Sequence, residues 1–64
     1  MYRFGERLKL VRKQLNISQK ELSEKLGISY VTVSQWESGK RKPKGRTVRR
    51  IAAALGVPVF RLLD

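Results

Sequence analysis

The 64-residue sequence contains no cysteine and no histidine. Without cysteine, no disulfide, no thiolate nucleophile and no cysteine-based zinc site is possible. Without histidine, the side chain that most often serves as a general base is missing. The carboxylates are five single residues spread along the chain: Glu6, Glu21, Glu24, Glu37 and Asp64. These absences predict a protein that is not an enzyme and that uses neither a metal ion nor another cofactor.

Long apolar segments are also absent. The longest apolar run covers residues 51–55, whereas a membrane-spanning helix needs ~20 apolar residues. The amino end, MYRFGERLKL, alternates charged and apolar residues and lacks the apolar core of a signal peptide. Because a small domain without disulfides also fits a reducing compartment, we expect a cytoplasmic protein with no membrane partner.

Acidic residues are missing from most of the second half of the chain. Residues 38–63 hold eight Lys or Arg and no Asp or Glu, whereas residues 1–37 hold seven basic and four acidic side chains. The net charge is +10, and the densest basic stretch is KRKPKGRTVRR at 40–50. Such a stretch is typical of proteins that bind a polyanion, and it is also compatible with a solvated face that serves only solubility. A cationic membrane-surface peptide is disfavoured because the apolar residues are spread over several short segments.

The chain is long enough for one domain only, which we place over residues 1–64. With 41% hydrophobic and 31% charged residues, its composition is that of a globular chain and not of a disordered one. A domain of this size buries only ~60% of the surface of its unfolded chain, so the core must be compact. A large ligand cavity is therefore excluded.

Apolar spacing predicts five short helices and no strand. The first helix covers about residues 3–14, and its buried stripe follows the helical period: Phe4, Leu8, Val11 and Leu15. A fourth helix has a similar stripe and ends at Gly56: Val48, Ile51, Ala52 and Leu55. Pro58 is predicted to be the first residue of a short fifth helix that carries Phe60 and Leu63.

Capping residues delimit the second and third helices. Ser18 and Glu21 match a capping box that starts a helix ending at Gly27. Ser29 caps the next helix, which ends at Gly39. The connecting turn of three or four residues is too short for an antiparallel pair, so the two helices must cross steeply. This arrangement is a helix-turn-helix over about residues 18–38.

The buried side of this pair determines what the other side exposes. Five residues are predicted to share the core: Leu22, Leu26, Ile28, Val33 and Trp36. Four side chains of the third helix must then face outward: Tyr30, Val31, Ser34 and Gln35. In a helix-turn-helix the second helix of the pair, here residues 29–38, enters the major groove of DNA. Ser23 is expected at the closest approach of the two helices because its side chain is small.

Three strings carry a resemblance to a known family: SQKELSEKLGIS, VSQWESGKRKP and IAAALGV. Over nearly its whole length the chain resembles the small DNA-binding domains of the lambdoid phage repressor and Cro type, also called the XRE family. The resemblance implies a compact, all-α, five-helix lambda-repressor-like fold whose second and third helices form the helix-turn-helix. It implies a nucleoid-associated transcriptional repressor or regulator that binds a palindromic operator in double-stranded DNA.

The resemblance also implies roles for single residues. The base-contacting positions are Tyr30, Val31, Ser34 and Gln35. The phosphate-contacting positions are Ser18, Gln19, Ser29, Thr32, Ser38, Lys40, Arg41 and Lys42. Arg12 and Glu37 match a partly buried ion pair between the first and third helices. Close phage relatives carry polar amides in place of Tyr30 and Val31, so their operator sequence cannot be transferred.

Side-chain chemistry refines some of these roles and leaves others open. Gln35 offers the donor and acceptor that adenine requires in the major groove, although a contact to phosphate alone is the alternative. Val31 fits a thymine methyl group. Tyr30 either contacts DNA or covers a helix edge, and Trp36 is predicted in the core and not on a base. Arg49 and Arg50 are compatible with solvated helix surface or with phosphate contact.

The family also implies a homodimer, at least on DNA, with its recognition helices about 34 Å apart. The dimer contacts are expected around four residues outside the helix-turn-helix: Val57, Pro58, Val59 and Phe60. Two alternatives remain: a protein-interaction module of the same fold, such as an antitoxin, and a non-specific nucleic-acid binder. The second is disfavoured because no series of aromatic residues is predicted at the surface. A domain excised from a longer repressor, or a redesigned family member, is equally compatible with the sequence.

Overall fold

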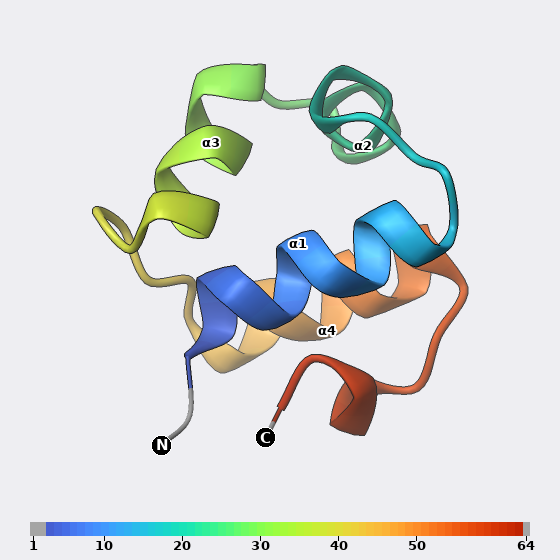
Figure 1. Cartoon of the computed structure of the whole chain (residues 1–64). Coiled ribbons are helices and arrows are strands. Elements are labelled where there is room, and N and C mark those ends of the chain that lie inside the picture. Colours follow the sequence, from blue (N-terminus) through green and yellow to red (C-terminus); the bar gives the residue numbers. More distant parts are fainter. Residues whose placement is uncertain (1–2, 64) are drawn as a thin grey trace.

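A computed structural model describes residues 3–63 and shows an all-helical chain. Within this range there are four α-helices, one short 3₁₀ helix and no strand (Figure 1). The elements are α1 (Phe4–Gln14), α2 (Gln19–Leu26), α3 (Tyr30–Ser38), α4 (Gly45–Leu55) and the 3₁₀ helix η1 (Val59–Arg61). The all-α prediction is confirmed, whereas the predicted count of five helices is wrong.

The predicted fifth helix is a single 3₁₀ turn. The Arg61 N–H donates to the Pro58 carbonyl (3.0 Å), and the Leu62 N–H donates to the Val59 carbonyl (2.9 Å). Pro58 has extended backbone and precedes the turn, so it is not the first helical residue. The tight turn brings Leu62 into the core with no exposed surface, and it leaves Phe60 69% exposed. A short 3₁₀ turn therefore stands where a regular helix was expected, and it brings Leu62 into the core within four residues of Pro58.

The predicted helix ends around the turn are confirmed. The Ser18 hydroxyl accepts the Glu21 N–H (2.9 Å), and the Glu21 carboxylate accepts the Ser18 N–H (2.8 Å). The Ser29 hydroxyl accepts the N–H two residues further on (3.1 Å). Gly27 and Gly39 end α2 and α3 with φ of +69° and +85°, a region that only glycine adopts without strain. These caps fix both ends of α3.

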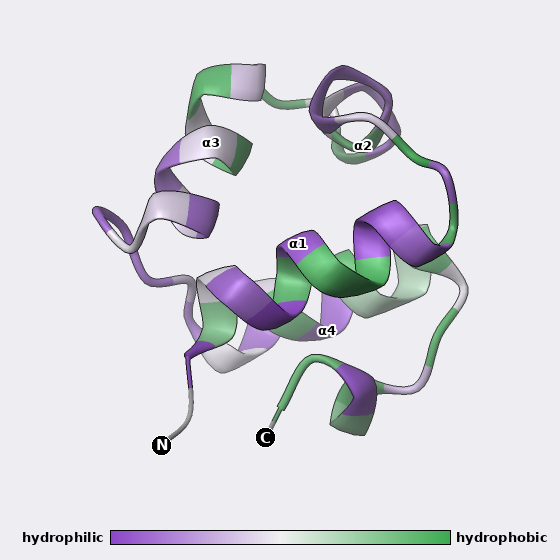
Figure 2. Ribbon diagram, viewed as in Figure 1, coloured by the Kyte–Doolittle hydropathy of each residue, from purple (hydrophilic) through white to green (hydrophobic). Residues whose placement is uncertain are grey.

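One side of every α-helix contributes to a shared core, and Figure 2 shows apolar and polar sides on α1, α2 and α4. The buried apolar residues are Phe4, Leu8, Val11, Leu22, Leu26, Val33, Trp36, Val48, Ile51, Ala52, Leu55 and Leu62. Leu15 was predicted on the buried stripe of the first helix, but it is 41% exposed. The reason is that α1 ends at Gln14, and the chain turns away at Asn16 with φ of +57°.

The third helix packs against both of its predecessors. Figure 1 views α2 nearly along its axis while α3 lies across the view, so the two helices cross steeply. Ser23 is buried near this crossing, and its hydroxyl donates to the Lys20 carbonyl (2.7 Å). At the other end of α3, a β-carbon on Gly5 of α1 would lie 2.6 Å from the Glu37 carbonyl oxygen. The absence of a side chain at Gly5 thus allows α1 to approach the last turn of α3.

Candidate nucleic-acid interface

The outer side of α3 carries the four predicted base-contacting residues. Tyr30 is 57% exposed and Val31 is 48% exposed, whereas Ser34 and Gln35 are partly buried. The opposite side of the same helix holds Val33 and Trp36, both buried in the core. The outer side contains no charged residue. It therefore offers hydrogen-bonding and apolar groups of the kind that distinguish base pairs in the major groove.

The loop after α3 holds four cations, Lys40, Arg41, Lys42 and Lys44, and none of them pairs with a carboxylate among residues 3–63. Lys40, Arg41 and Lys42 are exposed, and the Arg41 N–H anchors the loop by donating to the Gln35 carbonyl (3.2 Å). In the part of the chain that the structure describes, the ion pairs join Arg3 to Glu6 and Arg12 to Glu37. The loop thus places unneutralised positive charge next to the end of α3.

Other basic side chains stabilise the fold instead. Arg50 donates to the Leu26 carbonyl at the end of α2 (3.3 Å). Arg7 donates to the Arg61 carbonyl (3.0 Å), and Arg61 donates to the Gln14 side chain (3.1 Å). Arg49 and Arg50 are both exposed and lie in the same basic stretch, so sequence reasoning did not distinguish them. The two residues differ only in the folded chain, where the packing of α4 against α2 brings Arg50 to the Leu26 carbonyl.

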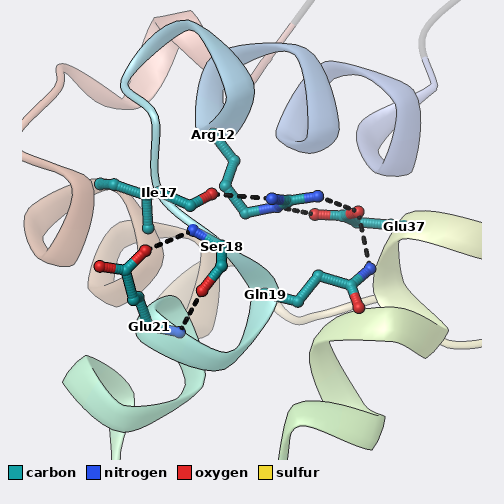
Figure 3. A network of polar contacts seen from close by, with 6 residues as sticks. All are labelled: Arg12, Ile17, Ser18, Gln19, Glu21 and Glu37. Carbon is teal, nitrogen blue, oxygen red and sulfur yellow. Dashed lines mark hydrogen bonds and ion pairs between the residues drawn. The ribbon is translucent and has the colours of Figure 1, made fainter.

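A polar network joins three helices behind the outer side of α3 (Figure 3). The Arg12 guanidinium donates to both Glu37 carboxylate oxygens, at 2.7 Å from Nε and 3.0 Å from Nη2. Arg12 Nη1 also donates to the Ile17 carbonyl (2.7 Å), just before α2 begins. The Arg12 and Glu37 side chains are 9% and 5% exposed. The ion pair that the resemblance implied is therefore present and nearly buried.

Gln19 belongs to the same network, which sequence reasoning missed. Its Nε2 donates to Glu37 Oε1 (3.0 Å), the oxygen that also accepts from Arg12. The sequence contains no signal for this contact because Gln19 and Glu37 are 18 residues apart and meet only through the crossing of α2 and α3. Gln19, the residue that the resemblance implies as a phosphate contact, is thus hydrogen-bonded to the Arg12–Glu37 ion pair.

Comparison with known proteins agrees with this geometry. A family model described as "Helix-turn-helix" matches residues 8–62. The chain belongs to this helix-turn-helix family. It is 41% identical over 51 residues to the HTH-type transcriptional regulator DicA of Escherichia coli K12, covering 80% of this chain and 38% of DicA. It is 39% identical over 51 residues to repressor protein C2 of Salmonella phage P22, covering 80% and 24% of the two chains. The predicted relationship to phage repressors is confirmed.

Solved structures give the same relationship for the fold of this helix-turn-helix domain. The solution structure of the P22 c2 repressor DNA-binding domain superposes with a TM-score of 0.85 at 36% identity, covering 92% of this chain and 78% of that one. A crystal structure of the P22 c2 repressor with a synthetic operator has a TM-score of 0.81 at 36% identity, covering 95% and 92%. The chain spans well under half the length of the two curated relatives described above.

Hydroxyl groups lie at the start of α2 and at both ends of α3. Ser18 and Ser29 accept backbone N–H groups as caps, and the Ser29 O–H stays available as a donor. Ser38 donates to the Gln35 carbonyl (3.2 Å), and its O–H must turn before it can reach a phosphate. Thr32 is partly buried within α3. Among these caps, Ser29 therefore keeps an O–H group that can donate to a partner.

The capping box also changes an acid–base property. The hydrogen bond from the Ser18 N–H, followed by the one that involves the Ser18 side chain, lowers the pKa of Glu21.

Residues 3–63 contain no cluster of carboxylates that could hold a metal ion. The helices described there are also too short or too polar to cross a membrane.

Proposed function

We propose that this helix-turn-helix domain binds double-stranded DNA in a sequence-specific way and regulates transcription by occupying an operator. The observation that carries the proposal is the separation of two kinds of side chain on one surface. The outer side of α3 is uncharged, and the unneutralised cations lie in the loop that follows it. Direct readout requires this division, because base edges need matched donors, acceptors and methyl contacts, whereas phosphates need positive charge.

The base contacts are assigned to Tyr30, Val31, Ser34 and Gln35. Gln35 offers one donor and one acceptor to adenine, and exposed Val31 packs on a thymine methyl group. Ser34 and Tyr30 add hydroxyl groups that donate or accept. Gln35 is partly buried, and this supports the role because partial burial reduces the rotamer freedom that the side chain would lose on binding.

The phosphate contacts are assigned to residues on both sides of the recognition helix. They are Ser18, Gln19, Ser29, Thr32, Ser38, Lys40, Arg41 and Lys42. The cations release counterions when they bind, which gives affinity for any sequence, and the hydroxyl and amide groups set the position of α3 on the duplex.

We further propose a cytoplasmic repressor that acts as a homodimer on a palindromic operator. The repressor role is supported by the relationship to the C2 repressor of phage P22, one of whose structures contains a synthetic operator. The dimer contacts are assigned to Val57, Pro58, Val59 and Phe60, next to η1. Phe60 is 69% exposed, and Val57 and Val59 pack only partly against the core. Such a dimer would place two copies of α3 about one DNA turn apart.

Selection of bound duplexes from a random DNA pool tests the function directly. We expect one motif with two-fold symmetry and half-sites of about four base pairs, near one turn apart. Affinity for this motif should exceed that for unrelated DNA by at least about 10³-fold. A pool that yields no motif, with equal affinity for all duplexes, would identify a non-specific binder. Loss of all DNA binding, with a second protein copurifying, would instead favour the antitoxin-like module.

A further inference from the structure

The Gln19 side chain occupies a defined position before any DNA is bound. Gln19 is the first residue of α2, directly after the Ser18 cap, and its side chain is partly buried. Figure 3 shows its amide directed toward Glu37 on the neighbouring helix α3. The Nε2 to Oε1 distance of 3.0 Å makes this a regular hydrogen bond. A side chain with three rotatable bonds is thereby held in one conformation.

The chemistry of Glu37 also determines which way the Gln19 amide faces. A carboxylate can only accept hydrogen bonds, so Gln19 must present Nε2 to it and not Oε1. Both Glu37 oxygens already accept hydrogen bonds from the Arg12 guanidinium. One Nε2 proton of Gln19 therefore points inward, and the second Nε2 proton stays free to donate elsewhere.

We propose that Glu37 is a positioning residue for DNA binding: it fixes the Gln19 amide so that its second Nε2 proton donates to a DNA phosphate. This inference rests on the proposed DNA-binding function and gives the buried Arg12–Glu37 pair a role beyond stability. Holding the amide in place before binding reduces the entropy that is lost when the contact forms. A Gln19 amide without Glu37 would sample several rotamers and both amide orientations.

Side-chain NMR of the unmodified free protein gives the first test. Gln14 is a suitable internal reference because it is exposed and its amide oxygen, not its Nε2, forms the hydrogen bond, which it accepts from Arg61. We expect one Gln19 Nε2 proton to exchange with water several-fold more slowly than either Gln14 proton. Addition of operator DNA should shift the other Gln19 proton. Equal exchange of all four protons would overturn the proposal.

A scan of operator phosphates gives the second test. Single phosphates of the selected site are replaced by neutral methylphosphonates, and affinity is measured for the wild type, Gln19→Ala and the double variant Arg12→Met with Glu37→Leu. One phosphate should weaken wild-type binding by roughly tenfold when neutralised, and Gln19→Ala should be insensitive there. We expect the double variant to be insensitive at that same phosphate and to keep its sensitivity at phosphates opposite the loop cations. Gln14→Ala, the matched control, should behave as the wild type.

A purely structural role for Glu37 predicts a different pattern. The double variant would then bind all duplexes more weakly but would keep the wild-type loss at the Gln19 phosphate, and this result would overturn the proposal. If Gln19→Ala responds as the wild type at every phosphate, the proposal also fails while DNA binding stands. A wild type that selects no DNA motif would refute the proposed function itself. If the double variant does not fold, as judged by circular dichroism, the NMR result decides.

Discussion

The two sides of α3 use polar groups in opposite ways. On the inner side, the Glu37 carboxylate accepts three hydrogen bonds from Arg12 and Gln19 and is nearly buried. Exposed Tyr30 lies on the outer side, and the loop cations follow it. Within residues 3–63, the side chains of these residues form no ion pair and no hydrogen bond. The inner side therefore determines where α3 lies, and the outer side is available to a partner. Changes on the inner side should alter stability as well as the Gln19 contact, and changes on the outer side should alter DNA binding and leave stability nearly unchanged.

The largest effect is expected from breaking the inner ion pair. Glu37→Ala leaves the Arg12 guanidinium nearly buried without its carboxylate, which costs about 3–5 kcal/mol of unfolding free energy. The paired replacement of Arg12 by Met and Glu37 by Leu removes both charges and should be milder. Urea unfolding followed by the fluorescence of buried Trp36 measures both values. A double variant less stable than Glu37→Ala would contradict this description of the pair.

The next largest effect is expected from the outer cations. Replacement of Lys40, Arg41 and Lys42 by alanine should weaken binding to every DNA sequence alike. The slope of log affinity against log salt should become less steep by about 2.7, because each phosphate contact contributes about 0.9. Unfolding free energy should change by less than about 0.5 kcal/mol because the side chains are exposed. An unchanged salt slope would show that this loop does not lie on DNA.

Gly5 and Gly45 differ in how much room surrounds them, and substitutions at the two positions test how closely α1 packs on α3. A methyl group at Gly5 would meet the backbone carbonyls of Trp36 and Glu37, whereas Gly45 has no atom within 4 Å of that position. Gly5→Ala should therefore reduce stability by about 1–3 kcal/mol, since backbone atoms cannot move aside easily. Gly45→Ala should be neutral or slightly stabilising. Thermal unfolding of the two variants gives the comparison, and equal melting temperatures would exclude close packing at Gly5.

These contacts show which features the sequence could predict and which it could not. Caps such as Ser18 and Gly27 were predictable because they act on backbone groups within a few residues. The buried side of α3 followed from the spacing of Val33 and Trp36. In contrast, nothing in the sequence indicates that Gly5 must lack a side chain, because its role depends on contact with backbone atoms more than 30 residues later.

The errors have the same physical origin. Leu15 fits the helical period of α1, but the helix ends one residue earlier and leaves it at the surface. Leu62, which follows the 3₁₀ turn and does not belong to a regular fifth helix, is buried in the core. Periodicity gives the direction of a side chain only while the helix continues, and tertiary packing decides where it stops.

A more local effect is expected from Gln35 on the outer side, because it concerns one symmetric pair of base positions. Gln35→Ala should weaken binding to the preferred site by about 1–3 kcal/mol and relax selectivity at one symmetric pair of positions. Stability should change little, since no side-chain hydrogen bond of Gln35 is present in the described part of the fold. Selection from a random pool with both proteins provides the measurement. If the two motifs coincide at every position, Gln35 contacts phosphate only, and specificity depends on Tyr30, Val31 and DNA shape.

The smallest effect concerns Glu21, a carboxylate that belongs to neither side of α3. Hydrogen bonds from Ser18 lower the pKa of Glu21 from its ordinary value of 4.5, so its folded pKa lies below its unfolded pKa. A group with this order stabilises the fold above the unfolded pKa, and the contribution is lost as pH falls through the folded pKa. Glu21→Gln should therefore be less stable than the wild type near pH 7, and the difference should shrink on acidification below about pH 4. Glu24→Gln, in the same helix but away from its first turn, is the matched control. Because α2 carries none of the residues assigned to base contacts, DNA specificity should stay unchanged in both variants, and a changed motif for Glu21→Gln would mean that the cap itself contributes to readout.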